Sequence, residues 1–255
     1  MSAQALLQQA TGLNLTSAAA ERAVRARMAV RGIAAHDAYL AQLSGAELTA
    51  LIELVVVPES WMFRDADAFT QAARAAARLA AAGRSVRILS IPCAAGEEPY
   101  SMAMALRDAG VPDAACSIDA VDLSAAAIER AREGVYTRNA FRGSELAFRD
   151  RYFSPDGANF RIHDSLRRQV RFQQGNLFTF DAARYDIVFC RNLLIYFDDA
   201  TIEQAIARLD ALLQDDGLLF AGYAEVPAFC RHGFASARLA GAFALRKHAP
   251  ALAPP

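Results

Sequence analysis

The chain has 255 residues and a formal net charge of −1, and hydrophobic residues make up 54% of it. This length accommodates one large domain or two modest ones, and this apolar content is sufficient for a buried core. The near-neutral charge argues against a dedicated nucleic-acid binder, because neutralising phosphates requires a basic surface.

Residues 1–75 are predicted to be all-helical, since Ala, Leu and Arg dominate and glycines fall where helices should end. One helix is expected from a cap at Thr16 or Ser17 to Arg31, and a second over 46–56. Four arginines spread over the first helix: Arg22, Arg25, Arg27 and Arg31. They form either a solvated face or a basic surface for an acidic helical partner, and the sequence leaves both open.

Residues 58–65, Pro-Glu-Ser-Trp-Met-Phe-Arg-Asp, interrupt the helical pattern. Two interpretations stay open for this segment around Trp61. It is either a hydrophobic linker anchored in the core or a ligand-facing lip with Ser60 and Arg64 turned inward. A long Ala-rich helix over 67–82 then leads to the first strand.

The stretch from 86 to 108 predicts the ligand end of a Rossmann-like unit. A buried strand over 86–91 is followed by small residues and then by a helix with Pro99 in its first turn. The turn lacks G-x-G-x-x-G and instead presents Glu97 and Glu98. Carboxylates there would repel a pyrophosphate and favour a cation or hydroxyl groups. The pattern therefore favours S-adenosylmethionine over NAD.

A second strand is expected over 116–123, with Ser124 capping a helix over 125–132. Asp122 then lies at the carboxyl end of this strand, where a Rossmann-type site places the acid that binds ribose hydroxyls. The alternative is that Asp122 is only a helix cap, although Ser124 is better placed for that role.

Residues 136–171 break the alternation of strands and helices, and we expect them to be an inserted β subdomain. Short antiparallel strands over 151–153 and 159–162 would flank a turn at 154–157. Insertions of this kind often carry partner contacts.

The core is expected to resume at 170–173, and Asn176 and Leu177 follow. A buried strand over 185–190 ends in Arg191 and Asn192, and an apolar turn with Tyr196 comes next. Polar residues at a strand's carboxyl end indicate a site, although Tyr196 alone is equally compatible with a packed aromatic.

The last predicted elements are a helix over 201–213 and strands over 218–223 and 241–246, the final strand pairing in an antiparallel hairpin. Residues 249–255 have the composition of a linker, which suggests that a further C-terminal region is missing.

The cysteines and histidines show neither a C-x-x-C pair nor metal-ligand spacing, so we expect a reduced, cytoplasmic protein without a zinc site. No apolar stretch approaches the length of a membrane span, and the N-terminus has no secretory signal pattern. We therefore expect no direct membrane insertion.

Several motifs together resemble the CheR-type chemoreceptor methyltransferases, and most closely their Wsp-type branch. They are Ser60-x-x-Phe-Arg64, Gly96-Glu-Glu-Pro-Tyr-Ser101, Val121-Asp-Leu-Ser124, Asn176-Leu177, Cys190-Arg-Asn-Leu-Leu-Ile-Tyr-Phe197 and Asp216-Gly-Leu-Leu-Phe220. The second and fifth are the specific ones. Many members have Asn where this chain has Pro58, so one polar cofactor contact is in doubt.

The resemblance implies an α/β fold: a Rossmann-like S-adenosylmethionine-dependent methyltransferase domain over 76–248, with its small inserted antiparallel β subdomain, after an all-helical N-terminal domain over 1–75. It implies a cofactor site formed by Ser60, Arg64, Glu97, Asp122, Asn176, Leu177, Arg191 and Asn192. It also implies that Tyr196 stands beside the transferable methyl group, with Arg64 assisting.

The implied substrate is glutamate on the cytoplasmic helical domain of a membrane chemoreceptor-like protein, modified by a monomeric enzyme. A solvent-exposed glutamate side chain has a pKa of about 4.3, so it is already an ionised nucleophile near neutral pH and needs no general base. The competing hypotheses are methylation of another protein, a small molecule or RNA, and a non-catalytic adaptor that binds receptors.

Overall fold

The computed structural model describes residues 2–143, 146–239 and 241–247. Four N-terminal helices come first: α1 (Ala3–Thr11), α2 (Ser17–Arg31), α3 (His36–Ala41) and α4 (Gly45–Ile52). They share a small apolar core that includes Leu7, Val24 and Leu51. As predicted, the Thr16 hydroxyl caps α2 by accepting the Ala19 N–H.

The centre of the molecule is a seven-stranded sheet with the order β6-β2-β1-β7-β8-β10-β9. Its strands are β1 (Val86–Ser90), β2 (Cys116–Asp122), β6 (Val170–Gln174), β7 (Tyr185–Cys190), β8 (Leu213–Ala221), β9 (Phe234–Leu239) and β10 (Ala242–Lys247). The first five in spatial order are parallel, and β10 pairs antiparallel with both β8 and β9, as expected for a C-terminal hairpin.

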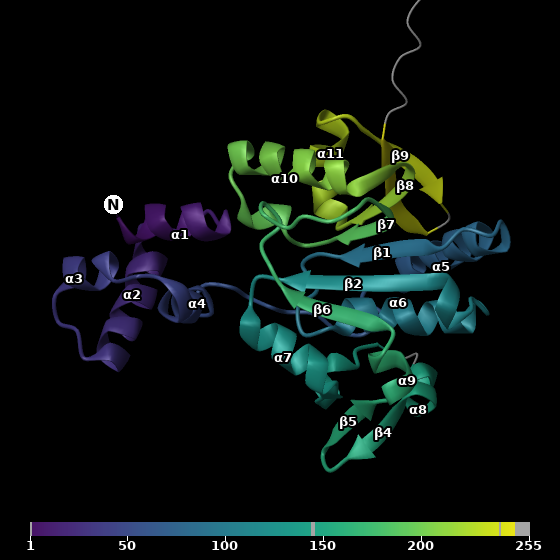
Figure 1. Ribbon diagram of the computed structural model, residues 1–255, viewed down its shortest axis with the longest axis horizontal. Coiled ribbons are helices and arrows are strands. Elements are labelled where there is room, and N and C mark those ends of the chain that lie inside the picture. The colour runs from purple at the N-terminus through teal and green to yellow at the C-terminus, as the bar shows by residue number, and fades with distance from the viewer. Residues whose placement is uncertain (1, 144–145, 240, 248–255) are drawn as a thin grey trace, which may run out of the picture.

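Alternate residues of each strand point to opposite faces of this sheet. Helices cover both faces, so both are buried. Ile88 belongs to the core beneath α5 (Ala66–Ala81) and α6 (Glu97–Asp108), whereas Leu89 belongs to the core beneath α10 (Asp199–Leu212) and α11 (Val226–Arg231). Helix α7 (Ala125–Glu133) packs along β2 and β6. Figure 1 shows α1–α4 facing the carboxyl ends of the parallel strands.

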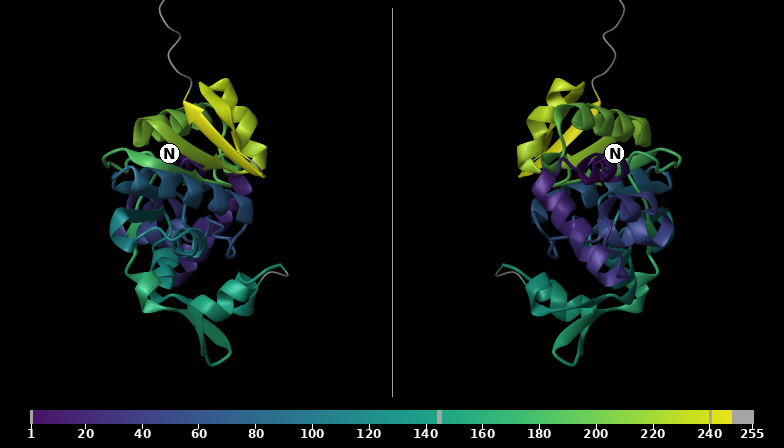
Figure 2. Two further views of the ribbon diagram at one scale, coloured as in Figure 1. Left: turned by 90° about the vertical axis from the view of Figure 1, so that its right-hand side faces the viewer. Right: turned by 90° about the vertical axis from the view of Figure 1, so that its left-hand side faces the viewer.

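The insertion forms a second, three-stranded antiparallel sheet with the order β3-β5-β4, and Figure 2 shows it projecting from the body. Its elements are β3 (Val135–Tyr136), α8 (Ala147–Tyr152), β4 (Phe153–Asp156), β5 (Asn159–Ile162) and α9 (Asp164–Arg167). The strand predicted over 151–153 is wrong in its first two residues. Arg151 and Tyr152 end α8, where both side chains contact Asp108.

The predicted architecture is confirmed: an α/β sheet with a small β insertion, preceded by helices. The helix predicted over 46–56 ends early, at Ile52, since the β-branched run Val55–Val57 lines a cavity instead. The domain limits remain a prediction, and residue 75 falls inside α5, which packs on the sheet. The tail at 249–255 lies outside the described residues.

Candidate functional site

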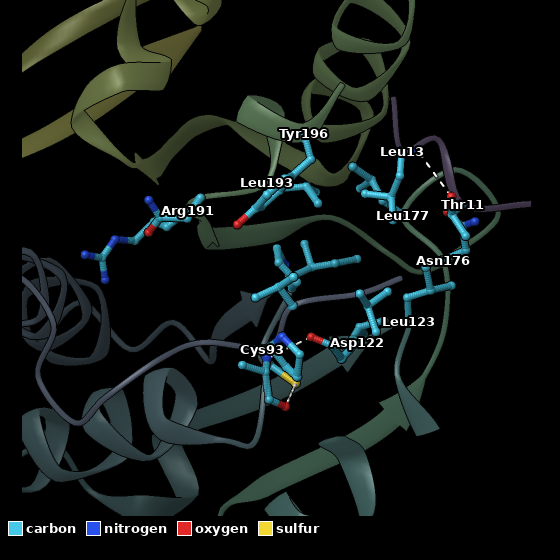
Figure 3. A pocket seen from close by; sticks show the side chains of 18 of the residues that line it. Thr11, Leu13, Cys93, Asp122, Leu123, Asn176, Leu177, Arg191, Leu193 and Tyr196 are labelled. Carbon is cyan, nitrogen blue, oxygen red and sulfur yellow. Dashed lines mark hydrogen bonds between the residues drawn. The ribbon is translucent and has the colours of Figure 1, made fainter. Parts of the chain in front are cut away.

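A cavity of about 390 Å³ lies where the N-terminal segments meet the carboxyl ends of β1, β2 and β7. This volume is in the range of roughly 300–1,000 Å³ typical of small-molecule sites. In Figure 3, Arg191 lies at one end of the cavity and Asn176 with Thr11 at the other, while Tyr196 and Asp122 lie on opposite sides of it.

Eight of the predicted site residues line this cavity: Ser60, Arg64, Asp122, Asn176, Leu177, Arg191, Asn192 and Tyr196. Glu97 does not line it, whereas the neighbouring Glu98 does. The topology accounts for this convergence, because side chains that follow parallel strands meet at one edge of the sheet.

The segment 58–65 is anchored in the core and also lines the cavity, so each of the two interpretations of its sequence holds for part of it. Met62 is buried in the core, and its N–H donates to the Ala140 carbonyl at 2.8 Å. Ser60 and Arg64, two residues away on either side, line the cavity. Burial and the nearby charge of Arg191 lower the pKa of Arg64. Pro58 also lines the cavity, at the position where a polar contact is in doubt.

Asp122 joins two backbone turns at the base of the cavity. Its Oδ2 accepts the Ala94 N–H at 2.8 Å and its Oδ1 accepts the Ser124 N–H at 2.9 Å. The Ser124 hydroxyl caps α7, so Asp122 is free of that role. Burial raises the pKa of Asp122 to about 6. Ala94 itself has a positive φ of 48°, a strained conformation of the kind that gathers at functional sites.

Glu98 and Arg191 form a buried ion pair beside the cavity. Arg191 Nη1 donates to Glu98 Oε2 at 3.3 Å, and Ser90 Oγ donates to Glu98 Oε1 at 2.8 Å. Burial raises the pKa of Glu98, while Arg191 opposes this shift. Arg191 also approaches Asp65 at 3.6 Å. Its Nε is buried and has no hydrogen-bond partner among the described residues, so this guanidinium keeps one unsatisfied donor.

Glu97 is buried, and its Oε2 has no hydrogen-bond partner among the described residues. Burial raises the pKa of Glu97 to about 7. An orphaned carboxylate oxygen next to a ligand cavity is expected to gain a partner when a ligand binds. The cofactor role of Glu97 stays a prediction, because Glu97 is not among the residues that line the cavity.

We predict that Glu97→Gln stabilises the cofactor-free chain in weakly alkaline solution. In the folded chain the pKa of Glu97 is about 7, above the ordinary value of 4.5. Between these values the folded chain holds a proton that the unfolded chain has released, so the unfolding free energy falls as pH rises. At about pH 8 the variant should gain about 1–3 kcal/mol.

Urea denaturation at about pH 8 and about pH 5 measures this effect, and the gain should shrink to less than half at the lower pH. If the variant is less stable than the wild type at both pH values, then ionisation of Glu97 does not lower the unfolding free energy, and the prediction is wrong.

The loop after β7 is held by Glu225, a residue that sequence reasoning missed. Its buried carboxylate accepts four backbone N–H groups within 2.7–2.8 Å, those of Asn192, Leu193, Leu194 and Gly222. Asn192 has a positive φ of 58°, which this carboxylate helps to maintain. Tyr196 follows in the same loop, is 43% exposed and is therefore not a packed core aromatic.

The N-terminal segment 11–15 also lines the cavity, which no local signal in the sequence indicates. Asn176 Nδ2 donates to the Ala10 carbonyl at 2.9 Å, and the Asn14 N–H donates to the Tyr196 carbonyl at 2.8 Å. Gln8 Nε2 donates to Asp198 Oδ2 at 2.7 Å. The helical region thus closes one wall of the site.

The four arginines of α2 differ in their surroundings. Arg27 makes a bidentate contact with Glu47, at 3.0 and 2.8 Å, and Tyr39 donates to the same carboxylate. Arg22, Arg25 and Arg31 are exposed, although Arg31 also approaches the Glu47 carboxylate at 3.8 Å. Arg27 therefore belongs to the structure of the helical region, and any basic surface consists of the other three.

These features suit a small ligand that carries cationic and hydroxyl groups. Glu98 and Asp122 line the cavity together with Arg64 and Arg191, and much of the remaining lining consists of Leu, Val, Ile and Phe side chains. Within the described ranges, His, Cys, Asp and Glu form no group able to hold a metal ion. No helix in those ranges is long and apolar enough to cross a membrane.

Comparison with known proteins identifies the family of this chain. The family described as "CheR methyltransferase, SAM binding domain" matches residues 59–235. The "Probable biofilm formation methyltransferase WspC" of Pseudomonas aeruginosa is 49% identical over 242 residues, which cover 89% of this chain and 57% of that protein. The protein of the same name from Pseudomonas putida is 44% identical, covering 95% and 60%.

A chemotaxis protein methyltransferase of Klebsiella aerogenes is 33% identical over 236 residues, covering 86% of this chain and 80% of that protein. The chain thus spans less than two thirds of the WspC proteins and most of this shorter relative.

Proposed function

Because this chain belongs to the CheR methyltransferase family, we propose that it methylates glutamate side chains on the cytoplasmic helices of a chemoreceptor-like protein. Its cofactor is S-adenosylmethionine, since the matched part is the SAM-binding domain of these enzymes. The observation that carries the proposal is the acid-lined cavity at the carboxyl ends of the strands, with a partly exposed Tyr196 among its lining residues.

When bound, S-adenosylmethionine supplies a methyl group on a positively charged sulfur. Asp122 would accept the ribose hydroxyls and Glu97 would take a polar or cationic group. The remaining cofactor contacts are assigned to Ser60, Arg64, Asn176, Leu177, Arg191 and Asn192. All but Glu97 line the cavity, which supports the assignment.

The acceptor glutamate would enter beside Tyr196 and Arg64, both of which line the cavity. An ionised carboxylate needs alignment rather than deprotonation, because its pKa of about 4.3 leaves it charged near pH 7. The Tyr196 hydroxyl would donate to one carboxylate oxygen and hold the other toward the methyl group. The lowered pKa of Arg64 reflects a partly desolvated cation, which supports a role in holding an anion.

The receptor would approach from the cytoplasm and dock directly on a monomer. The exposed Arg22, Arg25 and Arg31 would attract acidic helices. The β4–β5 turn at Gly157 is short, a feature that resembles members acting without a receptor tether. The exposed arginines and the short turn together support direct docking.

The test is methyl transfer from labelled S-adenosylmethionine to bacterial membranes that contain chemoreceptors. Label is expected in a protein of receptor size, and Tyr196→Phe should lower the rate without changing S-adenosylhomocysteine affinity. Label that enters only RNA or small molecules would reject the proposed substrate, and cofactor binding without any transfer would favour an adaptor.

A further inference from the structure

Exposed large apolar side chains are concentrated near the cavity. Among the described residues they are Val30, Leu54, Val57, Ile195, Tyr196, Tyr223 and Phe243. Val57, Ile195 and Tyr196 line the cavity. Single exposed apolar residues are ordinary, but a group of them around a binding site indicates an interaction surface.

Four of these side chains belong to neighbouring elements, and we call them together the aromatic wall: Ile195, Tyr196, Tyr223 and Phe243. The rings of Tyr223 and Phe243 lie with centroids 4.8 Å apart, although these side chains are 74% and 42% exposed. Tyr223 begins the short helix η4 (Tyr223–Glu225), which contacts η3 (Leu194–Tyr196). The two loops therefore place the wall directly beside the cavity.

One buried carboxylate fixes these two loops to each other. Glu225 accepts the N–H groups of Leu193 and Leu194 before Tyr196, and that of Gly222 before Tyr223. A Cβ atom at Gly222 would lie 2.6 Å from the Glu225 carboxylate and 3.3 Å from Asn192 Nδ2, so the loops are also closely packed. The wall is thus preorganised, which reduces the entropy lost on binding a partner.

Two arginine side chains lie near the cavity around the Trp61 ring. Two guanidinium groups lie over the Trp61 ring, that of Arg64 at 4.4 Å and that of Arg142 at 4.5 Å from its centroid. Arg64 and Glu59 line the cavity, and Arg142 of the insertion pairs with Glu59 at 3.1 Å. Carboxylates of a partner would be attracted to these arginines, whereas the aromatic wall suits apolar side chains.

We propose that the aromatic wall is a further docking surface, distinct from the arginines of α2, and that it holds the part of the receptor helix that carries the acceptor glutamate. This inference rests on the proposed function. When the acceptor glutamate reaches Tyr196, the receptor helix that carries it crosses the loops around Tyr196. Residues three or four positions from the acceptor lie on the same face of that helix. Small or apolar residues there would pack on Tyr223 and Phe243, while the acceptor carboxylate would enter between Tyr196 and Arg64.

The test is the double variant Tyr223→Ala/Phe243→Ala in the intact chain, with labelled methyl transfer to chemoreceptor-containing bacterial membranes. The KM for receptor should rise about tenfold, as for the loss of central aromatic contacts. The kcat at saturating receptor and the calorimetric affinity for S-adenosylhomocysteine should stay unchanged. The matched control Tyr223→Phe keeps the ring and should keep the wild-type KM.

An unchanged KM in the double variant, with an active wild type, would overturn the docking surface and leave the proposed function intact. A parallel loss of S-adenosylhomocysteine affinity would also overturn it, since the residues would then support the cofactor site. A wild type that labels no membrane protein would contradict the proposed function itself.

Discussion

Replacing Glu225 by Gln should lower the kcat of methyl transfer by about 100-fold, because it loosens the loop that carries Asn192 and Tyr196. The carboxylate accepts four backbone N–H groups, and a glutamine would turn its amide N–H₂ toward some of these donors. The unfolding free energy should fall by about 2–4 kcal/mol, since buried donors lose a charged acceptor. Single-turnover kinetics and urea denaturation measure the two effects.

The matched control is Asp186→Asn, at the opposite end of the strand that precedes this loop. Asp186 is also a buried carboxylate, which accepts the Arg87 N–H at 2.8 Å and a guanidinium N–H of Arg84 at 2.6 Å. This variant should lose stability of similar size and keep the wild-type kcat. Equal losses of kcat in both variants would mean that activity follows stability alone and would reject the positioning role of Glu225.

The second large effect is expected from Asp122→Asn, which should weaken S-adenosylhomocysteine binding about 10- to 100-fold at about pH 8. At that pH the wild-type carboxylate is ionised, because its pKa is about 6. The amide would lose one acceptor for ribose hydroxyls and would place a donor against the N–H of Ala94 or Ser124. Isothermal titration calorimetry gives the affinity directly.

Asp119→Asn is the control for this experiment, since Asp119 lies on the same strand but contacts Arg171 and Tyr185 outside the cavity. Its affinity for S-adenosylhomocysteine should equal that of the wild type. If Asp122→Asn also binds normally, the ribose assignment is incorrect and the carboxylate serves only to connect its two backbone turns.

Much of the candidate site could be predicted because it depends on strand ends. Asp122, Arg191 and Asn192 each end or follow a largely buried strand. Parallel strands bring such positions together at one edge of the sheet, whatever the conformation of the connecting loops. The arrangement of small residues and acids after β1 likewise indicated the ligand end of the sheet.

Contacts between distant segments could not be predicted from local pattern. Glu225 is one acid after an apolar strand, and nothing near it in sequence indicates that it binds the loop after β7. The docking of residues 11–15 on the site is a tertiary arrangement, as is the pairing of Arg27 with Glu47. The choice between Glu97 and Glu98 as the lining carboxylate depends on how α6 begins, which sequence determines only to within a residue or two.

The most direct measurement of the central claim is the chemical nature of the transferred methyl group. Receptor labelled by this chain from methyl-labelled S-adenosylmethionine should be digested and analysed by tandem mass spectrometry, before and after mild alkali. We predict a methyl group on glutamate side chains that alkali releases as methanol, because an ester is labile and no base is needed to form it. A label on lysine, arginine or another nitrogen that survives alkali would contradict it.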